Sequence, residues 1–255
     1  MRLLRAALAL WTLSLRQLVW SLNSLMMVFP IAGCVLFVLV QRYHRPTLGN
    51  RAFQEFSNEF VLTVFSAFLL PLIALAYTTS SLAGDREDRT LVYLVTRPIP
   101  RPLMLLMKLA ACLPIVLGLA MAVLAGCSWL AGPPGLKALA IYWPGVLLLG
   151  FAYTCLFLLF AVWFRHATIV AVVYSLFVEI VLGNMPGMIK QWALNFYGRS
   201  LMLGWGKEHG LEMPPTNLFV PLTAEDAWLR LWLIALGALA LATISFQRKE
   251  FRDLV

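Results

Sequence analysis

The chain has 255 residues, of which 61% are hydrophobic and only 13% are charged, and its formal net charge at neutral pH is +8. Soluble domains are closer to half apolar and a quarter charged, so a water-soluble fold of this size could not cover so much apolar surface. The composition therefore excludes a soluble globular domain and predicts an integral membrane protein. The basic residues collect near the ends of apolar stretches, where Lys and Arg set topology and contact anionic lipid, and this placement argues against nucleic acid as a partner.

The N-terminal residues 2–20 predict an amphipathic helix that lies in the membrane interface. Its apolar positions, at helical spacing, are Leu3, Leu4, Ala7, Leu8, Trp11, Leu15 and Leu18. Arg2, Arg5 and Arg16 fall mostly on the other face. A basic face opposite Leu and Trp is typical of interfacial helices, and we favour this interpretation over a helix that simply extends the first span.

Six stretches are apolar and long enough to cross a bilayer, which takes about 20 residues of helix. The expected spans are residues 22–40, 60–79, 103–131, 141–164, 167–183 and 227–246. We read the polar stretch 41–59 as the connection between the first two spans and residues 132–135 as a turn. Only Arg165 and His166 separate the fourth and fifth spans, which predicts a tight antiparallel hairpin.

Residues 184–226, before the last span, combine prolines, charges and aromatic side chains. This stretch is too broken to cross the membrane, and we expect short helices at the interface or dipping into it. The predicted fold class is thus an all-α integral membrane protein, a single transmembrane domain over residues 1–255. It has six transmembrane helices, an N-terminal interfacial helix and a broken interfacial stretch before the last span. More Lys and Arg lie on the side of the termini than opposite, which predicts cytoplasmic termini. The expected location is the bacterial cytoplasmic (inner) membrane.

Motifs for catalysis or ligand binding are lacking in the sequence. The nearest approach to a phosphate-binding loop, Gly204-Trp205-Gly206-Lys207, has no hydroxyl residue after the lysine. The histidines and cysteines have neither metal-ligand nor disulfide spacing. We therefore expect no catalytic residue, cofactor or metal on this chain, and no enzymatic activity of its own.

A single carboxylate stands out inside an expected span. Glu179 lies within the apolar run 170–182 of the fifth span, where a charge costs about 2.5–3.5 kcal/mol on insertion scales. Something must offset this cost, so we expect a protein or water partner. Two roles remain open: Glu179 lines a translocation path, or it is a structural residue bonded to another helix or to residues 184–226.

The connection between the second and third spans, residues 84–101, carries a mixed-charge cluster followed by an apolar stripe and prolines. This segment resembles the signature of the type-2 exporter permeases of ABC transporters. The matching positions are Asp85, Glu87, Thr90, Leu91, Leu94, Pro98, Arg101 and Lys108. Arg89 stands where the family usually has glycine. Independently of the family, Leu91, Leu94 and Val95 share one face of a helix, which suits docking of a cytosolic partner.

The resemblance implies the membrane-spanning permease subunit of an ATP-driven exporter, which forms its translocation path as a dimer. Its expected partners are a separate cytosolic ATP-binding cassette subunit, carrying ATP and magnesium, and a second permease subunit, identical or related, within the lipid bilayer. Coupling to the ATPase is expected at Asp85, Glu87, Thr90, Leu91, Leu94 and Arg101. A membrane scaffold or assembly factor, or a secondary transporter without an ATPase, are the alternatives.

Overall fold

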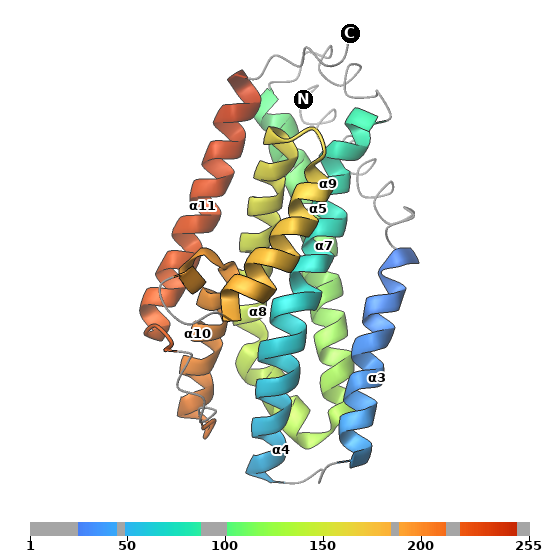
Figure 1. Ribbon diagram of the computed structural model, residues 1–255, viewed down its shortest axis with the longest axis vertical. Coiled ribbons are helices and arrows are strands. Elements are labelled where there is room, and N and C mark those ends of the chain that lie inside the picture. The colour runs from blue at the N-terminus through green and yellow to red at the C-terminus, as the bar shows by residue number, and fades with distance from the viewer. Residues whose placement is uncertain (1–24, 45–48, 88–100, 185–188, 213–219, 249–255) are drawn as a thin grey trace, which may run out of the picture.

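The computed structural model describes residues 25–44, 49–87, 101–184, 189–212 and 220–248. Within these ranges the chain is almost entirely helical, and the long helices run side by side as a bundle (Figure 1). Four helices are long and apolar enough to cross a membrane: residues 50–81, 102–131, 133–163 and 224–248. They confirm the second, third, fourth and sixth expected spans as helices of sufficient length. The first and fifth correspond to shorter apolar helices, Val28–His44 and Ala167–Val181.

The centre of the bundle is α8 (Pro133–Trp163), which packs against α7 (Arg101–Ala131), α5 (Leu70–Glu87) and α11 (Ala224–Arg248). It is apolar around its whole circumference, as expected of a helix surrounded by others. Of the most apolar 18-residue stretch of α8, 78% is buried inside the protein, whereas only 28% of the corresponding stretch of α11 is buried. The largest buried side chains of α8 include Tyr142, Tyr153 and Phe157. α8 is therefore the central helix against which α5, α7 and α11 pack.

α11 shows how sequence divides a span into an inner and an outer face. Its buried residues are Ala227, Leu231, Ala235, Ala238, Ala242 and Phe246, at steps of three or four that form one stripe. Four of them are alanines, and small residues allow helix backbones to approach closely within a membrane. Leu229, Leu233 and Leu236 on the opposite face are exposed, and we assign this face to lipid.

The second expected span is part of a longer helix than the sequence predicts. α4 (Asn50–Glu55) continues into a π-helical segment, η1 (Phe56–Leu69), and then into α5. α3 (Val28–His44) likewise extends into the polar stretch 41–59, so both helices continue beyond the span bounds expected from the sequence. The polar side chains pair within the protein: Gln41 Nε2 donates to Glu59 Oε2 at 2.7 Å, and Arg42 Nη1 donates to the Leu130 carbonyl at 2.6 Å.

The predicted turn at residues 132–135 is also shorter in the structure. Only Gly132 leaves the helical conformation, with a φ of 82° that favours glycine. Pro133 then begins α8, as proline does well in a first helical turn. The fourth helix therefore starts eight residues before the predicted span boundary at residue 141, whereas its end at Trp163 agrees within one residue. The interfacial helix predicted at residues 2–20 lies outside the described residues.

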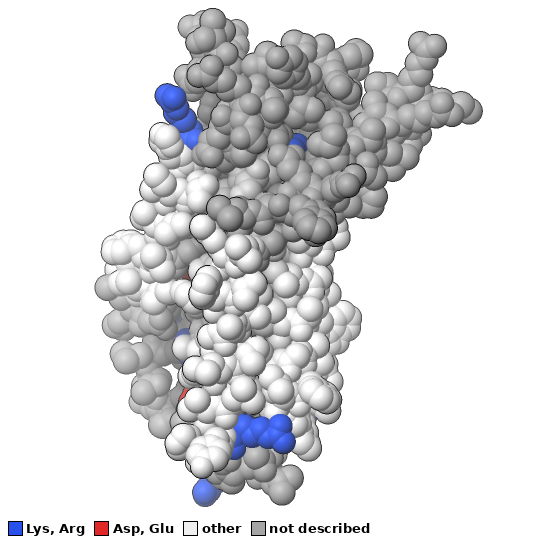
Figure 2. Space-filling model, turned by 90° about the vertical axis from the view of Figure 1, so that its right-hand side faces the viewer, with Lys and Arg blue, Asp and Glu red and all other residues white. Residues whose placement is uncertain are grey.

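Hydrogen bonds between distant segments define the two ends of the bundle. Trp163 Nε1 donates to Ser245 Oγ at 2.9 Å, and Thr168 Oγ1 donates to Thr79 Oγ1 at 3.3 Å. At the other end, Lys137 Nζ donates to the His209 carbonyl at 3.0 Å. Between the ends, Figure 2 shows a broad uncharged surface on the side where α3 lies, with basic side chains near the lower end and at the upper edge.

The stretch before the last span is folded into short helices, as predicted, and none of its described helices is among the candidate spans. They are η3 (Leu182–Asn184), η4 (Ile189–Trp192) and α10 (Leu194–Glu208). In Figure 1, α10 lies beside only the lower part of α8 and α11. Ten of its fifteen residues are buried. α10 therefore enters the bundle partway along its length and runs to the end where α8 begins.

Glycine at position 198 allows α10 to lie close to α8. A Cβ added there would come within 2.5 Å of Leu149 Cδ2, and Leu149 is fully buried. Gly198→Val should therefore lower the free energy of unfolding by about 1–3 kcal/mol, the usual cost of overpacking. Gly237→Val in α11 is the control, since an added Cβ there meets nothing within 4 Å. Thermal unfolding in detergent would measure both, and equal melting temperatures would contradict the close packing.

Candidate functional site around Glu179

Glu179 is the charged group at the centre of the candidate site. It belongs to η2 (Tyr174–Val181), the π-helical continuation of α9 (Ala167–Val173), and none of its surface is exposed. Its Oε1 accepts a hydrogen bond from the backbone N–H of Leu194 at 2.9 Å. Its Oε2 accepts one from the N–H of Asn195, also at 2.9 Å. The carboxylate thus has the protein partner that its position in an apolar span led us to expect.

Both donors are the first two residues of α10, and this explains why the bonds are favourable. The first four N–H groups of a helix have no partner inside it, and the N-terminus carries a partial positive charge that attracts anions. The residue at the N-cap is Ala193, whose methyl group cannot accept a hydrogen bond. Glu179 therefore caps α10 from another segment of the chain.

The surroundings of the carboxylate are partly polar. The hydroxyls of Tyr153 on α8 and Tyr174 on η2 both lie close to it. Within the described residues, the Tyr153 hydroxyl and the Asn195 Oδ1 are buried without a hydrogen bond of regular geometry. Gly183 allows the close approach of the two segments, because an added Cβ would lie 3.2 Å from the Cβ of Ala193. The site therefore joins η2, α8 and the start of α10.

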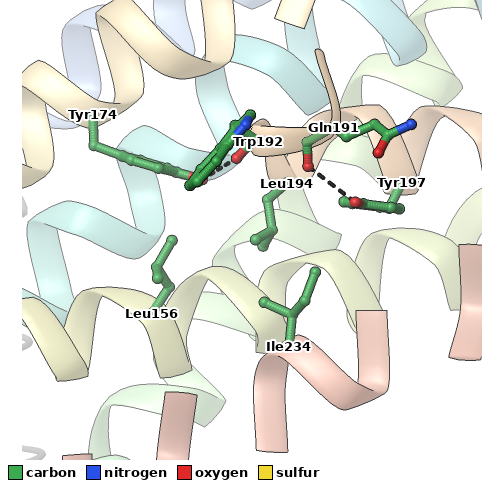
Figure 3. Close-up of a pocket in the computed structure, with 7 residues that line it drawn as sticks. All are labelled: Leu156, Tyr174, Gln191, Trp192, Leu194, Tyr197 and Ile234. Atoms are coloured by element: carbon green, nitrogen blue, oxygen red, sulfur yellow. Dashed lines mark hydrogen bonds between the residues drawn. The ribbon is translucent and has the colours of Figure 1, made fainter. Parts of the chain in front are cut away.

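A pocket of about 560 Å³ adjoins this junction (Figure 3). Its lining comes from four parts of the chain: Leu156, Tyr174, Gln191, Trp192, Leu194, Tyr197 and Ile234. The side chains of Leu156, Leu194 and Ile234 point into one apolar space. Tyr174 Oη donates to the Trp192 carbonyl at 3.5 Å, and Tyr197 Oη donates to the Gln191 carbonyl at 3.0 Å. Since Leu194 also bonds to Glu179, the capping contact fixes one wall of the pocket.

The predicted coupling residues are only partly within the described structure. By backbone, Asp85 and Glu87 lie in the last turn of α5, and Arg101 is the first residue of α7. Thr90, Leu91 and Leu94 lie outside the described residues. The end of α5 and the start of α7 are at the same end of the bundle as the end of α11 (Figure 1). Among the described residues, no group of three or more His, Cys, Asp or Glu is placed to hold a metal ion.

Comparison with protein families decides the class of protein. The model of the ABC-2 family transporter protein matches residues 11–187, well over half of the chain. The chain belongs to this family. It is therefore a membrane protein of the ABC-2 transporter permease type, which the resemblance of residues 84–101 predicted. No curated protein matches the sequence as a relative.

The ABC-2 match covers every residue proposed for coupling and also Glu179. The match ends before η4, so α10 and α11 lie outside it. Five of the seven pocket residues also follow the matched part, and only Leu156 and Tyr174 lie within it. Sequence analysis missed the pocket, because its lining is dispersed over four segments. The sequence offered one signal for this region, the Glu179 carboxylate, because a carboxylate inside an apolar run predicts a bonding partner.

Proposed function

We propose that this ABC-2 protein is the membrane-spanning permease subunit of an ATP-driven exporter. Two copies, or one copy and a related chain, form the translocation path. Separate cytosolic ATP-binding cassette subunits bind ATP and magnesium and drive transport. The family match over residues 11–187 carries this proposal, and the lack of a phosphate-binding loop in the sequence agrees with a nucleotide site on a partner.

Coupling is assigned to residues 84–101, which join α5 directly to α7. A permease receives force from an ATPase at the membrane surface, and the receiving segment must be attached to the helices that move. α5 and α7 each pack on the central helix α8. A displacement of the segment between them can therefore reach the core of the bundle. Leu91 and Leu94 supply the apolar contact, and Asp85 and Glu87 pair with basic groups of the ATPase.

Two roles were left open for Glu179. We propose that it anchors α10 and does not line the translocation path. Both carboxylate oxygens accept backbone N–H groups, and the side chain is fully buried. A lining residue would present an oxygen to the path. The anchor holds the start of α10 against α8. From there α10 runs toward the end of the bundle opposite to the end of α5 and the start of α7.

Purification tests the proposed function directly. A tagged chain expressed with the ATP-binding cassette proteins of its own cell should retain one of them in mild detergent, and the reconstituted complex should hydrolyse ATP. A scaffold would yield a complex without transport-linked hydrolysis. Purification of the chain with no ATPase, under conditions that preserve the native melting temperature, would refute coupling to a separate subunit.

The proposed orientation predicts which positions can be labelled from outside the cell. Arg51 and Glu208 are exposed residues on the side expected to face outward, and each is suitable for a single introduced cysteine. Arg51→Cys and Glu208→Cys, in a cysteine-free variant, should react with a membrane-impermeant maleimide on intact cells. Arg165→Cys, exposed between α8 and α9, should react only after permeabilisation. The reverse pattern would place the termini outside the cytoplasm.

A further inference from the structure

We propose that the pocket between α8, η2, α10 and α11 binds one acyl chain of a lipid taken from the surrounding bilayer. The inference concerns a binding site on this chain alone and does not depend on an ATPase. It starts from the position of the pocket along the helices, and then follows from its lining and its opening.

The pocket lies at hydrocarbon depth. Ile234 is near the middle of the 25-residue α11, Tyr174 is at the junction of α9 and η2, and Leu156 is in the second half of α8. A bilayer offers apolar chains at this depth and little water. The occupant available to the pocket is therefore the tail of a lipid rather than its headgroup.

The lining favours an apolar occupant. Leu156, Leu194 and Ile234 form the interior seen in Figure 3. The two tyrosine hydroxyls at the rim donate to the backbone carbonyls of Trp192 and Gln191, so they do not need a polar ligand. Water is held in cavities by two to four polar partners, and the side chains of Leu156, Leu194 and Ile234 offer none. Filling about 560 Å³ with a hydrocarbon chain restores contacts that unfilled walls would lose.

The opening is continuous with surface that faces lipid. Trp192, which lines the pocket, is 78% exposed, so the pocket reaches the surface of the bundle. A chain can therefore enter from the bilayer without passing a polar barrier.

The test uses photolabelling with matched variants. The purified chain is reconstituted in vesicles of phosphatidylethanolamine and phosphatidylglycerol that contain a phosphatidylcholine with a diazirine in the middle of one acyl chain. After irradiation, mass spectrometry maps the labelled residues. We expect label on the pocket side chains Leu156, Leu194 or Ile234. Ile234→Trp places a larger side chain in the pocket and should lower this labelling by about tenfold, the loss expected when a couple of methylene contacts are excluded.

Leu233→Trp is the control, because Leu233 is adjacent in α11 but points outward and is 62% exposed. It should leave labelling of the pocket unchanged. If Ile234→Trp does not yield a monodisperse protein, Ile234→Phe takes its place with the same expectation. Equal pocket labelling in the Ile234→Trp variant and in the Leu233→Trp control would overturn the proposal. So would a wild-type protein labelled only on outward residues, which would mean that another surface, such as a second copy of the chain, covers the pocket.

Discussion

Leu91→Asp is expected to release the ATPase subunit from the permease. A helix over the proposed coupling segment would place Leu91 and Leu94 on one face, where we propose that they are the apolar anchors of the contact. Truncating or charging an anchor at the centre of an interface commonly costs about 2 kcal/mol or more, which is roughly a thirtyfold loss of affinity. Co-purification of the ATPase and transport-linked ATP hydrolysis should therefore both fall steeply.

Tyr93→Asp is the matched control for this substitution. In a helix over this segment, residue 93 would lie about 200° around the axis from Leu91 and away from the stripe of Leu91, Leu94 and Val95. The same charge in the same segment should therefore have a much smaller effect. Glu87→Lys should weaken assembly in a way that depends on salt, because charges at an interface rim act mainly on association and register. If Leu91→Asp leaves both ATPase binding and coupled hydrolysis intact, the docking site is elsewhere and the coupling mechanism fails.

The long helices could be predicted because hydropathy reports directly on residues at hydrocarbon depth. Helix ends could not, since a helix continues beyond the hydrocarbon wherever its polar side chains find partners. Gln41 donates a hydrogen bond to Glu59, which is distant in sequence, and Arg42 donates one to the carbonyl of Leu130 near the end of α7. Neither contact has a local signature. The same limit applies at Pro133 and Pro134, which read equally well as a turn or as the first turn of a helix.

The candidate site was predictable only in part, for a similar reason. A buried carboxylate in an apolar run implies a partner, but nothing near Glu179 in sequence says which one. The start of α10 carries Ala193 where a local capping residue would stand, so the usual helix-start signal is missing. The cap is supplied from fifteen residues earlier. The pocket needs four segments to be folded together, and none of them shows a recognisable motif alone.

Replacing Glu179 should have the largest effect on the fold of any single substitution at this site. Glu179→Leu leaves the N–H groups of Leu194 and Asn195 buried without an acceptor, at about 1–3 kcal/mol for each orphaned donor. Glu179→Gln keeps one acceptor oxygen, so about half of this loss is expected, together with the loss of the charge that favours the helix N-terminus. The order of stability should therefore be wild type, Gln, then Leu.

Two measurements separate the capping role from a general loss of stability. Melting temperatures in detergent should follow that order, while Glu225→Leu, which removes an exposed carboxylate at the start of α11, should change little. Hydrogen exchange in reconstituted protein should accelerate first at the amides of Leu194 and Asn195, because these are the groups that lose their acceptor. Unchanged exchange at these two amides in Glu179→Leu would show that the carboxylate does not hold α10, and a role in the translocation path would then be the better explanation of its burial.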